Sequence, residues 1–134
     1  MFKAIQTSVS GLIAATARIN VAASNIVNSQ VKSTPSPQGA TRTGESFRGY
    51  SPQRVEQITT QSGGVQARSV PVSPASLSVF DPTSPLASEQ GLVNIPNVSL
   101  PAEISELIRA KHAYKANAAV LKTLDDTFKT ISNI

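Results

Sequence analysis

The 134 residues suffice for one domain, and their composition limits the chemistry that it can carry. The chain has no Cys, no Trp, one His and only 4% aromatic residues, which excludes disulfides and thiolate metal sites and leaves few large side chains for a core. The net charge of +4 is uneven: residues 1–80 hold seven Lys/Arg against two Glu, whereas residues 81–134 hold five basic and six acidic residues. Such asymmetry fits either a surface for a polyanion or one end of a subunit that meets the next.

A helix is predicted for residues 1–28, which contain no proline. Apolar residues recur there at alternating spacings of four and three, which keeps one stripe, or seam, facing a partner helix. Thr16 is the one polar position within this seam, whose other members are Ile5, Val9, Leu12, Ile19, Ala23 and Ile26. Because Asn25 and Asn28 tolerate the left-handed conformation that often follows a helix, we expect the helix to end near Val27.

The segment 29–100 is predicted to be an insertion of loop, β-hairpin and Pro-rich connector. All nine prolines fall between Pro35 and Pro101, and proline excludes a long helix there. Residues 53–60 and 65–70 are rich in strand-forming residues and flank the Gly63-Gly64 pair, which predicts a hairpin. The Ser-, Thr- and Pro-rich residues before it are typical of a loop.

A second helix is predicted for residues 101–134. Pro101 suits the first helical turn, Glu103 lies near the positive end of the helix dipole, and Lys129 lies near the negative end. Its seam alternates spacings of three and four over eight positions: Leu107, Ala110, Tyr114, Asn117, Leu121, Leu124, Phe128 and Ile131. A polar Asn117 within an apolar seam is expected to fix the register of the helix pair.

These elements predict a mainly α protein, in which two long terminal helices pair as a coiled coil around a small β-hairpin and loop insertion. Both helices also carry apolar residues away from the seam, and these would remain in contact with water in a monomer. We therefore expect contacts between subunits, with the following candidates: Ile13, Ile104, Ile108 and Val120.

Catalysis is not indicated by these residues. His112 is the only histidine and lies away from the seam, and neighbouring Asp125 and Asp126 point about 100° apart on a helix. Neither a phosphate-binding Gly-rich loop nor a nucleophile-elbow motif occurs. We expect no enzyme activity, no cofactor, no metal, no small-molecule substrate and no membrane span.

Nucleic-acid binding is the alternative that the charges leave open. Basic residues are interleaved with Phe47 and Tyr50, which would combine phosphate contacts with base stacking. The arginines concerned are Arg42, Arg48, Arg54 and Arg68, and a row of lysines on the second helix adds Lys115, Lys122 and Lys129. These charges are diluted by Ser, Gln and Thr, so a structural role is favoured.

Several motifs, taken in order, resemble those of the flagellar basal-body rod protein family. Ser10-Gly11-Leu12, with residues 18–28 (RINVAASNIVN), is similar to the N-terminal signature of flagellar rod and hook proteins, and residues 103–123 are similar to their closing helix. Asp81-Pro82, residues 85–87, Gly91 and residues 96–98 resemble the connector of the proximal rod protein lettered C. Val27 departs from the family pattern, which usually has Ala there.

This resemblance implies a structural subunit of the proximal rod that assembles helically through its terminal helices, transmits torque and forms part of the wall of the export channel. It implies partners among other copies of the chain and neighbouring rod proteins. It further implies export through the flagellar type III apparatus to the periplasmic rod without a cleaved signal peptide. The short apolar run at residues 12–15 agrees, since it is far below the length of a signal-peptide core.

Overall fold

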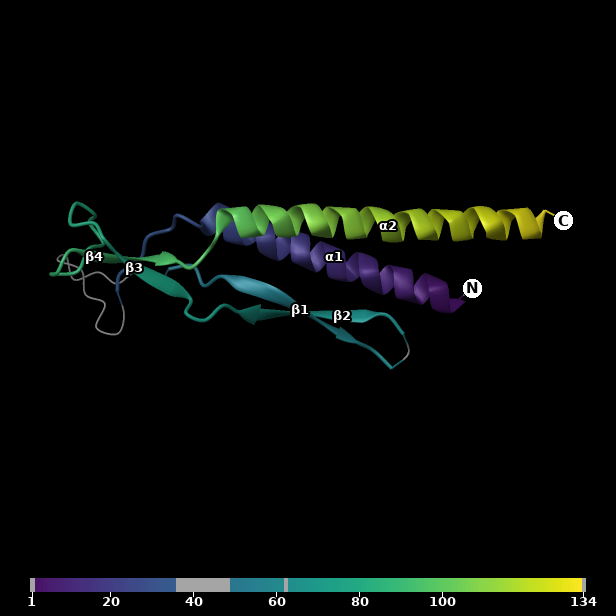
Figure 1. The fold of residues 1–134 in the computed structure, drawn as a ribbon, viewed down its shortest axis with the longest axis horizontal. Helices are drawn as coiled ribbons and strands as arrows, with labels where there is room; N and C mark the ends of the chain where they lie inside the picture. Colours follow the sequence, from purple (N-terminus) through teal and green to yellow (C-terminus); the bar gives the residue numbers. More distant parts are fainter. Residues whose placement is uncertain (1, 36–48, 62, 134) are drawn as a thin grey trace. The chain divides into compact units, whose positions relative to one another are not determined.

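The computed structural model describes residues 2–35, 49–61 and 63–133, which form two helices and four strands. Helix α1 spans Phe2–Asn28 and helix α2 spans Leu100–Ser132. Between them lie β1 (Gln53–Thr59), β2 (Val65–Pro71), β3 (Ser76–Phe80) and β4 (Leu92–Pro96) (Figure 1). The chain divides into two compact units, a helical unit of residues 1–22, 54–70 and 104–134 and a sheet unit of residues 23–53 and 71–103.

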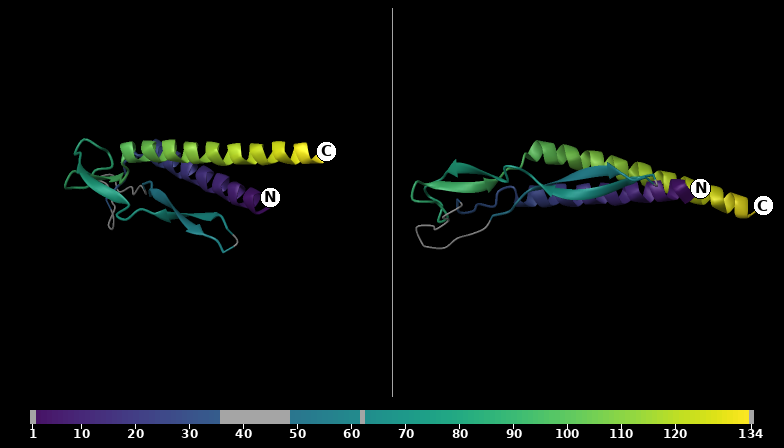
Figure 2. Two further views of the ribbon diagram at one scale, coloured as in Figure 1. Left: turned by 45° about the vertical axis from the view of Figure 1, so that its right-hand side comes forward. Right: turned by 90° about the horizontal axis from the view of Figure 1, so that it is seen from below.

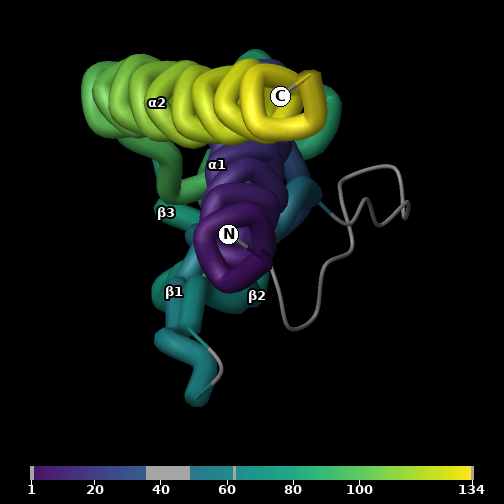
Figure 3. Tube along the Cα trace, turned by 90° about the vertical axis from the view of Figure 1, so that its right-hand side faces the viewer, coloured from purple at the N-terminus to yellow at the C-terminus, as the bar shows by residue number. Residues whose placement is uncertain are grey.

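The helical unit combines segments from both ends of the chain with the β1–β2 hairpin. Helices α1 and α2 run in opposite directions, so that the start of α1 and the end of α2 point the same way (Figures 1 and 2). Seen along the helices, α1 lies between α2 and the hairpin (Figure 3). One face of α1 therefore packs against a helix and another against a sheet.

The expected fold class, mainly α with a coiled-coil helix pair and one small hairpin, is wrong. Besides the β1–β2 sheet, β3 and β4 form a second two-stranded antiparallel sheet, in which Leu77 pairs with Ile95 and Val79 pairs with Val93. Ser33 extends that sheet by a single bridge to Asn94, with N–O distances of 2.8 and 2.9 Å. The insertion is therefore a substantial β structure, and the protein combines two helices with two small antiparallel sheets.

Proline explains why the second sheet is difficult to predict. Pro71 and Pro96 are the last residues of β2 and β4, and Pro74 lies just before β3. Strand ends tolerate proline because few ladder hydrogen bonds are lost there. The prolines thus mark strand ends within a segment that the sequence predicts only to be a connector.

Helix α1 does not end at an asparagine in the left-handed backbone conformation. No described residue other than glycine has a positive φ angle. Asn28 is the last helical residue, and its Nδ2 donates to the carbonyl oxygen of Ser24 at 2.8 Å. Asn25 instead lies within the helix and is 1% exposed, which gives it a different role, described below.

The buried core of the described residues is made mainly of small side chains. The fully buried apolar residues are Ala14, Ala15, Ala22, Ala87, Val93 and Ala110. Val93 of β4 is the only large aliphatic side chain among them. Twelve large apolar side chains of the two helices are at least 38% exposed to solvent, which is unusual for a self-sufficient domain.

Candidate interaction surface

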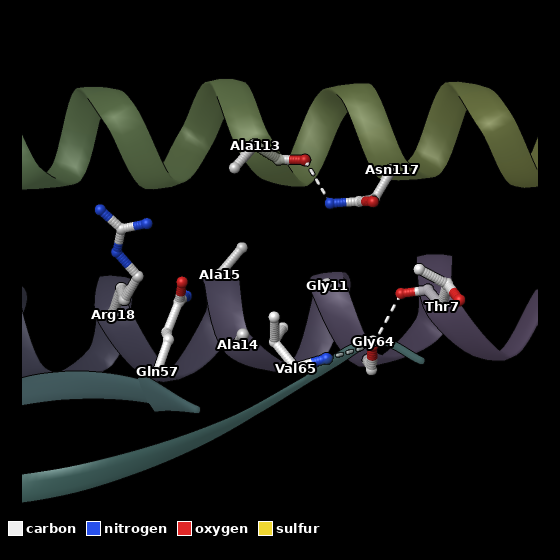
Figure 4. A pocket seen from close by; sticks show the side chains of 11 residues that line it. Thr7, Gly11, Ala14, Ala15, Arg18, Gln57, Gly64, Val65, Ala113 and Asn117 are labelled. Carbon is white, nitrogen blue, oxygen red and sulfur yellow. Dashed lines mark hydrogen bonds between the residues drawn. The ribbon is translucent and has the colours of Figure 1, made fainter. Parts of the chain in front are cut away.

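Small residues line the face of α1 that meets α2. Ser8, Ala15 and Ala22 are buried at heptad spacing, and Gly11 lies between them. A Cβ atom at Gly11 would stand only 2.6–2.8 Å from the side-chain atoms of Asn117 on α2 (Figure 4). The two helices therefore approach closely where glycine and alanine leave room, as interaxial distance depends on the side chains at the contact.

This buried face lies one position away from the seam predicted on α1. Ile5 and Val9 are each 39% exposed, while the other apolar seam positions are half-buried: Leu12, Ile19, Ala23 and Ile26. One residue corresponds to about 100° of rotation, so the predicted seam lies on the flank of the helix contact. The sequence signal for the true face is the recurrence of small residues at positions 8, 11, 15 and 22.

On α2 the seam positions differ in their surroundings. Ala110 is fully buried, whereas Tyr114, Phe128 and Ile131 are exposed. The remaining four positions are half-buried: Leu107, Asn117, Leu121 and Leu124. Asn117 faces Gly11, and its Nδ2 donates to the Ala113 carbonyl oxygen at 2.9 Å. Its predicted role in fixing the register of the helix pair stays a prediction.

The β1–β2 hairpin is fastened to α1 through Ser10. The Ser10 hydroxyl donates to the Thr7 carbonyl oxygen at 2.7 Å and accepts from the Val65 amide at 3.1 Å. Gly64 precedes Val65 with a φ of +98°, and a Cβ atom there would collide with Ser10 Oγ. The Ser-Gly pair of the N-terminal signature thus serves two contacts, since Ser10 holds the hairpin and Gly11 admits α2.

Alanine substitutions at the two turn glycines should separate docking of the hairpin from its local conformation. Both residues have positive φ, so either substitution should lower the free energy of unfolding by about 1 kcal/mol. A Cβ atom at Gly63 would meet only Thr7 Oγ1 at 3.7 Å, whereas one at Gly64 meets Ser10. Gly64→Ala should therefore cost about 1 kcal/mol more than Gly63→Ala in urea unfolding. Equal costs would contradict the docking role of Ser10.

An ion pair joins the two helices within the helical unit. Arg18 Nε donates to Glu106 Oε1, and Arg109 Nη2 donates to the other carboxylate oxygen at 2.9 Å. The side chains of Arg18 and Glu106 are 23% and 27% exposed. The hydrogen bond from Arg18 is the main reason that the pKa of Glu106 lies below its ordinary value, and the same bond raises the pKa of Arg18.

This ion pair should make stability fall in acid. A carboxyl whose pKa is lowered by folding stabilises the protein above its unfolded pKa, and that stabilisation disappears as the pH drops through the folded pKa. We expect the free energy of unfolding to decrease below about pH 4, and Arg18→Gln to flatten this decrease. Arg54→Gln is the matched control, because its pair with Glu56 is exposed. The check is urea unfolding between about pH 2.5 and 7, a range around the ordinary pKa of a carboxyl group. An unchanged slope in Arg18→Gln would contradict the assignment.

In the sheet unit, Asn25 forms a fully satisfied buried network. Its Nδ2 donates to the Gln53 carbonyl oxygen at 2.7 Å and to Glu103 Oε1 at 2.9 Å. Its Oδ1 accepts from the Tyr50 hydroxyl at 2.8 Å and from the Gln53 amide at 3.1 Å. One side chain therefore ties the end of α1 to the start of β1 and to the first turn of α2.

A second polar contact of the sheet unit involves the connector motif. Lys32 Nζ lies 2.6 Å from Asp81 Oδ2, and the Thr83 hydroxyl donates to Asp81 Oδ1 at 2.7 Å. The hydrogen bond from Lys32 is the main cause that lowers the pKa of Asp81. Gly91, with φ +75°, is required beside these residues because a Cβ atom there would lie 2.9 Å from the ring of Phe80.

Large apolar side chains are exposed along both helices. The four residues predicted to contact other subunits are all exposed, at 64% for Ile13, 51% for Ile104, 52% for Ile108 and 46% for Val120. Near the start of α1 and the end of α2, an open groove of about 670 Å³ is lined by Phe2, Ile5, Leu121, Leu124, Asp125 and Phe128. That these side chains contact a second subunit stays a prediction.

Other predicted features are placed as follows. His112 and Asp126 are exposed on α2, and Asp125 is paired with Lys129 at 2.6 Å. The described residues contain no group of three His, Asp or Glu side chains that could hold a metal. Neither α1 nor α2, as described, has a stretch long and apolar enough to cross a membrane. Arg42, Phe47 and Arg48 lie outside the described residues.

Known proteins are similar to this chain over most of its length. Residues 89–134 match the family described as flagellar basal body rod FlgEFG protein C-terminal. The flagellar basal-body rod protein FlgC of Salmonella typhimurium is 34% identical over 124 residues, which cover 86% of this chain and 83% of that protein. FlgC of Yersinia enterocolitica is 35% identical, covering 85% and 82%, and FlgC of Aquifex aeolicus is 29% identical, covering 96% and 92%.

Proposed function

This chain belongs to the FlgC family of flagellar basal-body rod proteins, and on that premise we propose that it is built into the rod through its two terminal helices. As a member of this family it is a structural subunit of the flagellar basal body and not an enzyme, and it assembles with other rod proteins. Neighbouring copies of the chain and adjacent rod proteins are the partners that we propose for the helices.

One observation supports assembly through the helices: many large apolar side chains of α1 and α2 are exposed, while alanines and Gly11 occupy the contact between them. Exposed apolar patches of this extent mark protein interfaces. The helix pair therefore has apolar surface left to bury against neighbours. An isologous contact would close a dimer, whereas a head-to-tail contact repeated around an axis builds an open helical tube.

In such a tube the subunit has a mechanical role. Helices packed side by side around an axis would form part of the wall of the export channel and would transmit torque along the rod. We further propose that the chain reaches a periplasmic position through the flagellar type III apparatus without cleavage of a signal peptide. The similarity to flagellar basal-body rod proteins supports this route.

Substitution of Ile13 tests the proposed interface without disturbing the helix pair. Ile13→Asp places a charge where burial is expected, so it should abolish assembly and swimming while the circular dichroism of the dilute chain stays unchanged. Ile13→Leu keeps an apolar side chain and should retain both. The measurements are sedimentation at rising concentration with added rod proteins, and motility of bacteria that carry the variant. Normal swimming of Ile13→Asp would refute a role of this face in assembly.

No observation on the described residues favours nucleic-acid binding. Arg54 is paired with Glu56 at 2.7 Å, and Lys129 is paired with Asp125. Two of the basic positions that suggest a polyanion site are thus neutralised within the chain.

A further inference from the structure

The solvent-facing side of α2 carries a stripe in which isoleucines are followed by lysines. At about 100° per residue, its members lie within about 60° of arc and extend over about 27 Å of the helix. We call this surface the basic stripe; it consists of Ile104, Ile108, Lys111, Lys115 and Lys122. All five side chains are exposed. The stripe belongs entirely to the helical unit.

The lysines of the basic stripe have no partner among the described residues. The five ion pairs of the described chain engage Arg18, Lys32, Arg54, Arg109 and Lys129. The helical unit as a whole holds nine Lys/Arg against four Asp/Glu, a net charge of +5, whereas the sheet unit holds three against four. The positive charge is thus concentrated in the unit that carries the helices.

The described helices of a second copy offer little free negative charge to the basic stripe. Helix α1 contains Lys3 and Arg18 but no acidic residue. On α2, Glu106 and Asp125 are already paired and Glu103 accepts a bond from Asn25. Among the described acidic residues, only Glu89 and Asp126 make no ion pair or side-chain hydrogen bond. Packing α1 of another copy on the basic stripe would therefore juxtapose like charges, which disfavours that pairing.

We infer that the basic stripe binds an acidic amphipathic helix from a different protein, which lays apolar residues on Ile104 and Ile108 and carboxylates beside the lysines. This inference rests on the proposed rod assembly and assigns one surface of it to a heterologous neighbour. The exposed isoleucines at the start of the stripe favour a helix over a nucleic acid, because apolar anchors at helical spacing fit a second amphipathic helix. Opposite charges then select the partner and its orientation.

A pair of labelled peptides tests this assignment on the full chain. The acidic probe is a helical peptide of about 19 residues, the length that spans the stripe, with glutamates flanking a row of leucines. The matched probe has lysine in place of every glutamate. Fluorescence anisotropy should show that only the acidic probe binds and that salt weakens its binding. The triple variant K111Q/K115Q/K122Q should lose about tenfold in affinity, since each exposed pair contributes modestly.

A second triple variant controls for net charge. K3Q/R54Q/R68Q removes the same three charges elsewhere, so it should bind the acidic probe nearly as well as the unmodified chain. The inference would be overturned if both triple variants lost affinity for the acidic probe equally, or if the unmodified chain did not bind that probe. Tighter binding of duplex DNA than of the acidic probe would also overturn it. Sedimentation tests the proposed function separately. The K111Q/K115Q/K122Q variant should self-associate like the unmodified chain. An unmodified chain that never self-associates would contradict assembly between copies, whatever the peptide result.

Discussion

Replacing Asn25 with Asp should destabilise the sheet unit by about 3 kcal/mol or more at neutral pH. The substitution is nearly isosteric, but it exchanges the two N–H donors for an oxygen that faces the Gln53 carbonyl and the Glu103 carboxylate, now 2.7 and 2.9 Å away. Two carboxylates would then be held together, one of them at a position that is 1% exposed. Unpaired buried charge is among the most costly changes that a protein can receive.

The same variant should recover part of its stability in acid. Like charges in contact raise the pKa of one of the two carboxyls, so protonation restores a hydrogen-bond donor between them. Asn28→Asp is the matched control, since the side chain of Asn28 bonds only within α1. Its substitution should cost about 0.5 kcal/mol at the negative end of the helix dipole. Urea unfolding at pH 7 and at pH 4 measures both. An Asn25→Asp chain as stable as Asn28→Asp would show that the network is dispensable.

Gly11→Val should destabilise the helical unit by about 3 kcal/mol. The first atom of any side chain at residue 11 would stand 2.6–2.8 Å from Asn117, and valine adds two methyl groups in a helix that fixes its rotamer. The helices would have to separate, which would expose Ala15 and Ala110 as well. Ala4→Val is the control, because Ala4 is exposed on the same helix.

A double-mutant cycle identifies Asn117 as the obstacle. Gly11→Ala gains about 1 kcal/mol in helix propensity. It loses this gain to the clash between the new Cβ atom and Asn117, because the Asn117 amide is held by its hydrogen bond to the Ala113 carbonyl oxygen. Combined with Asn117→Ala, the same substitution should become stabilising by about 1 kcal/mol. Thermal unfolding followed by circular dichroism supplies the four values. Additive effects in the cycle would mean that Gly11 and Asn117 are not in contact.

Much of the fold is predictable from where proline and apolar periodicity occur. Proline-free flanks with a three–four alternation predict the helices, which span Phe2–Asn28 and Leu100–Ser132. The paired glycines predict the turn between β1 and β2. The β3–β4 sheet is missed because each strand has only five residues and prolines adjoin them. Polar and apolar residues do alternate at positions 76–79, and this is the signal that identifies β3.

The interaction surface is less predictable, because the residues that position it are small or polar. Periodicity analysis weights large aliphatic side chains, so it selects Ile5 and Val9 over Gly11 and Ala15. The role of Asn25 depends on partners at residues 50, 53 and 103, and no local pattern specifies such distant partners. The family-like motifs include Ser10, Gly11 and Asn25, although their physical roles become clear only from the contacts.

The pairing of opposite chain ends also determines the order in which this protein acquires structure. Arg18 and Glu106 are separated by 88 positions, and Ser10 and Val65 by 55. Contacts so distant in sequence form slowly, since a long loop must close before any of them is made. A chain that emerges from the ribosome N-terminus first can dock its β1–β2 hairpin on α1, but α1 lacks its helical partner until α2 (Leu100–Ser132) has been synthesised. Until then the side of α1 that receives α2 stays accessible, and the helical unit completes its packing only after α2 has emerged.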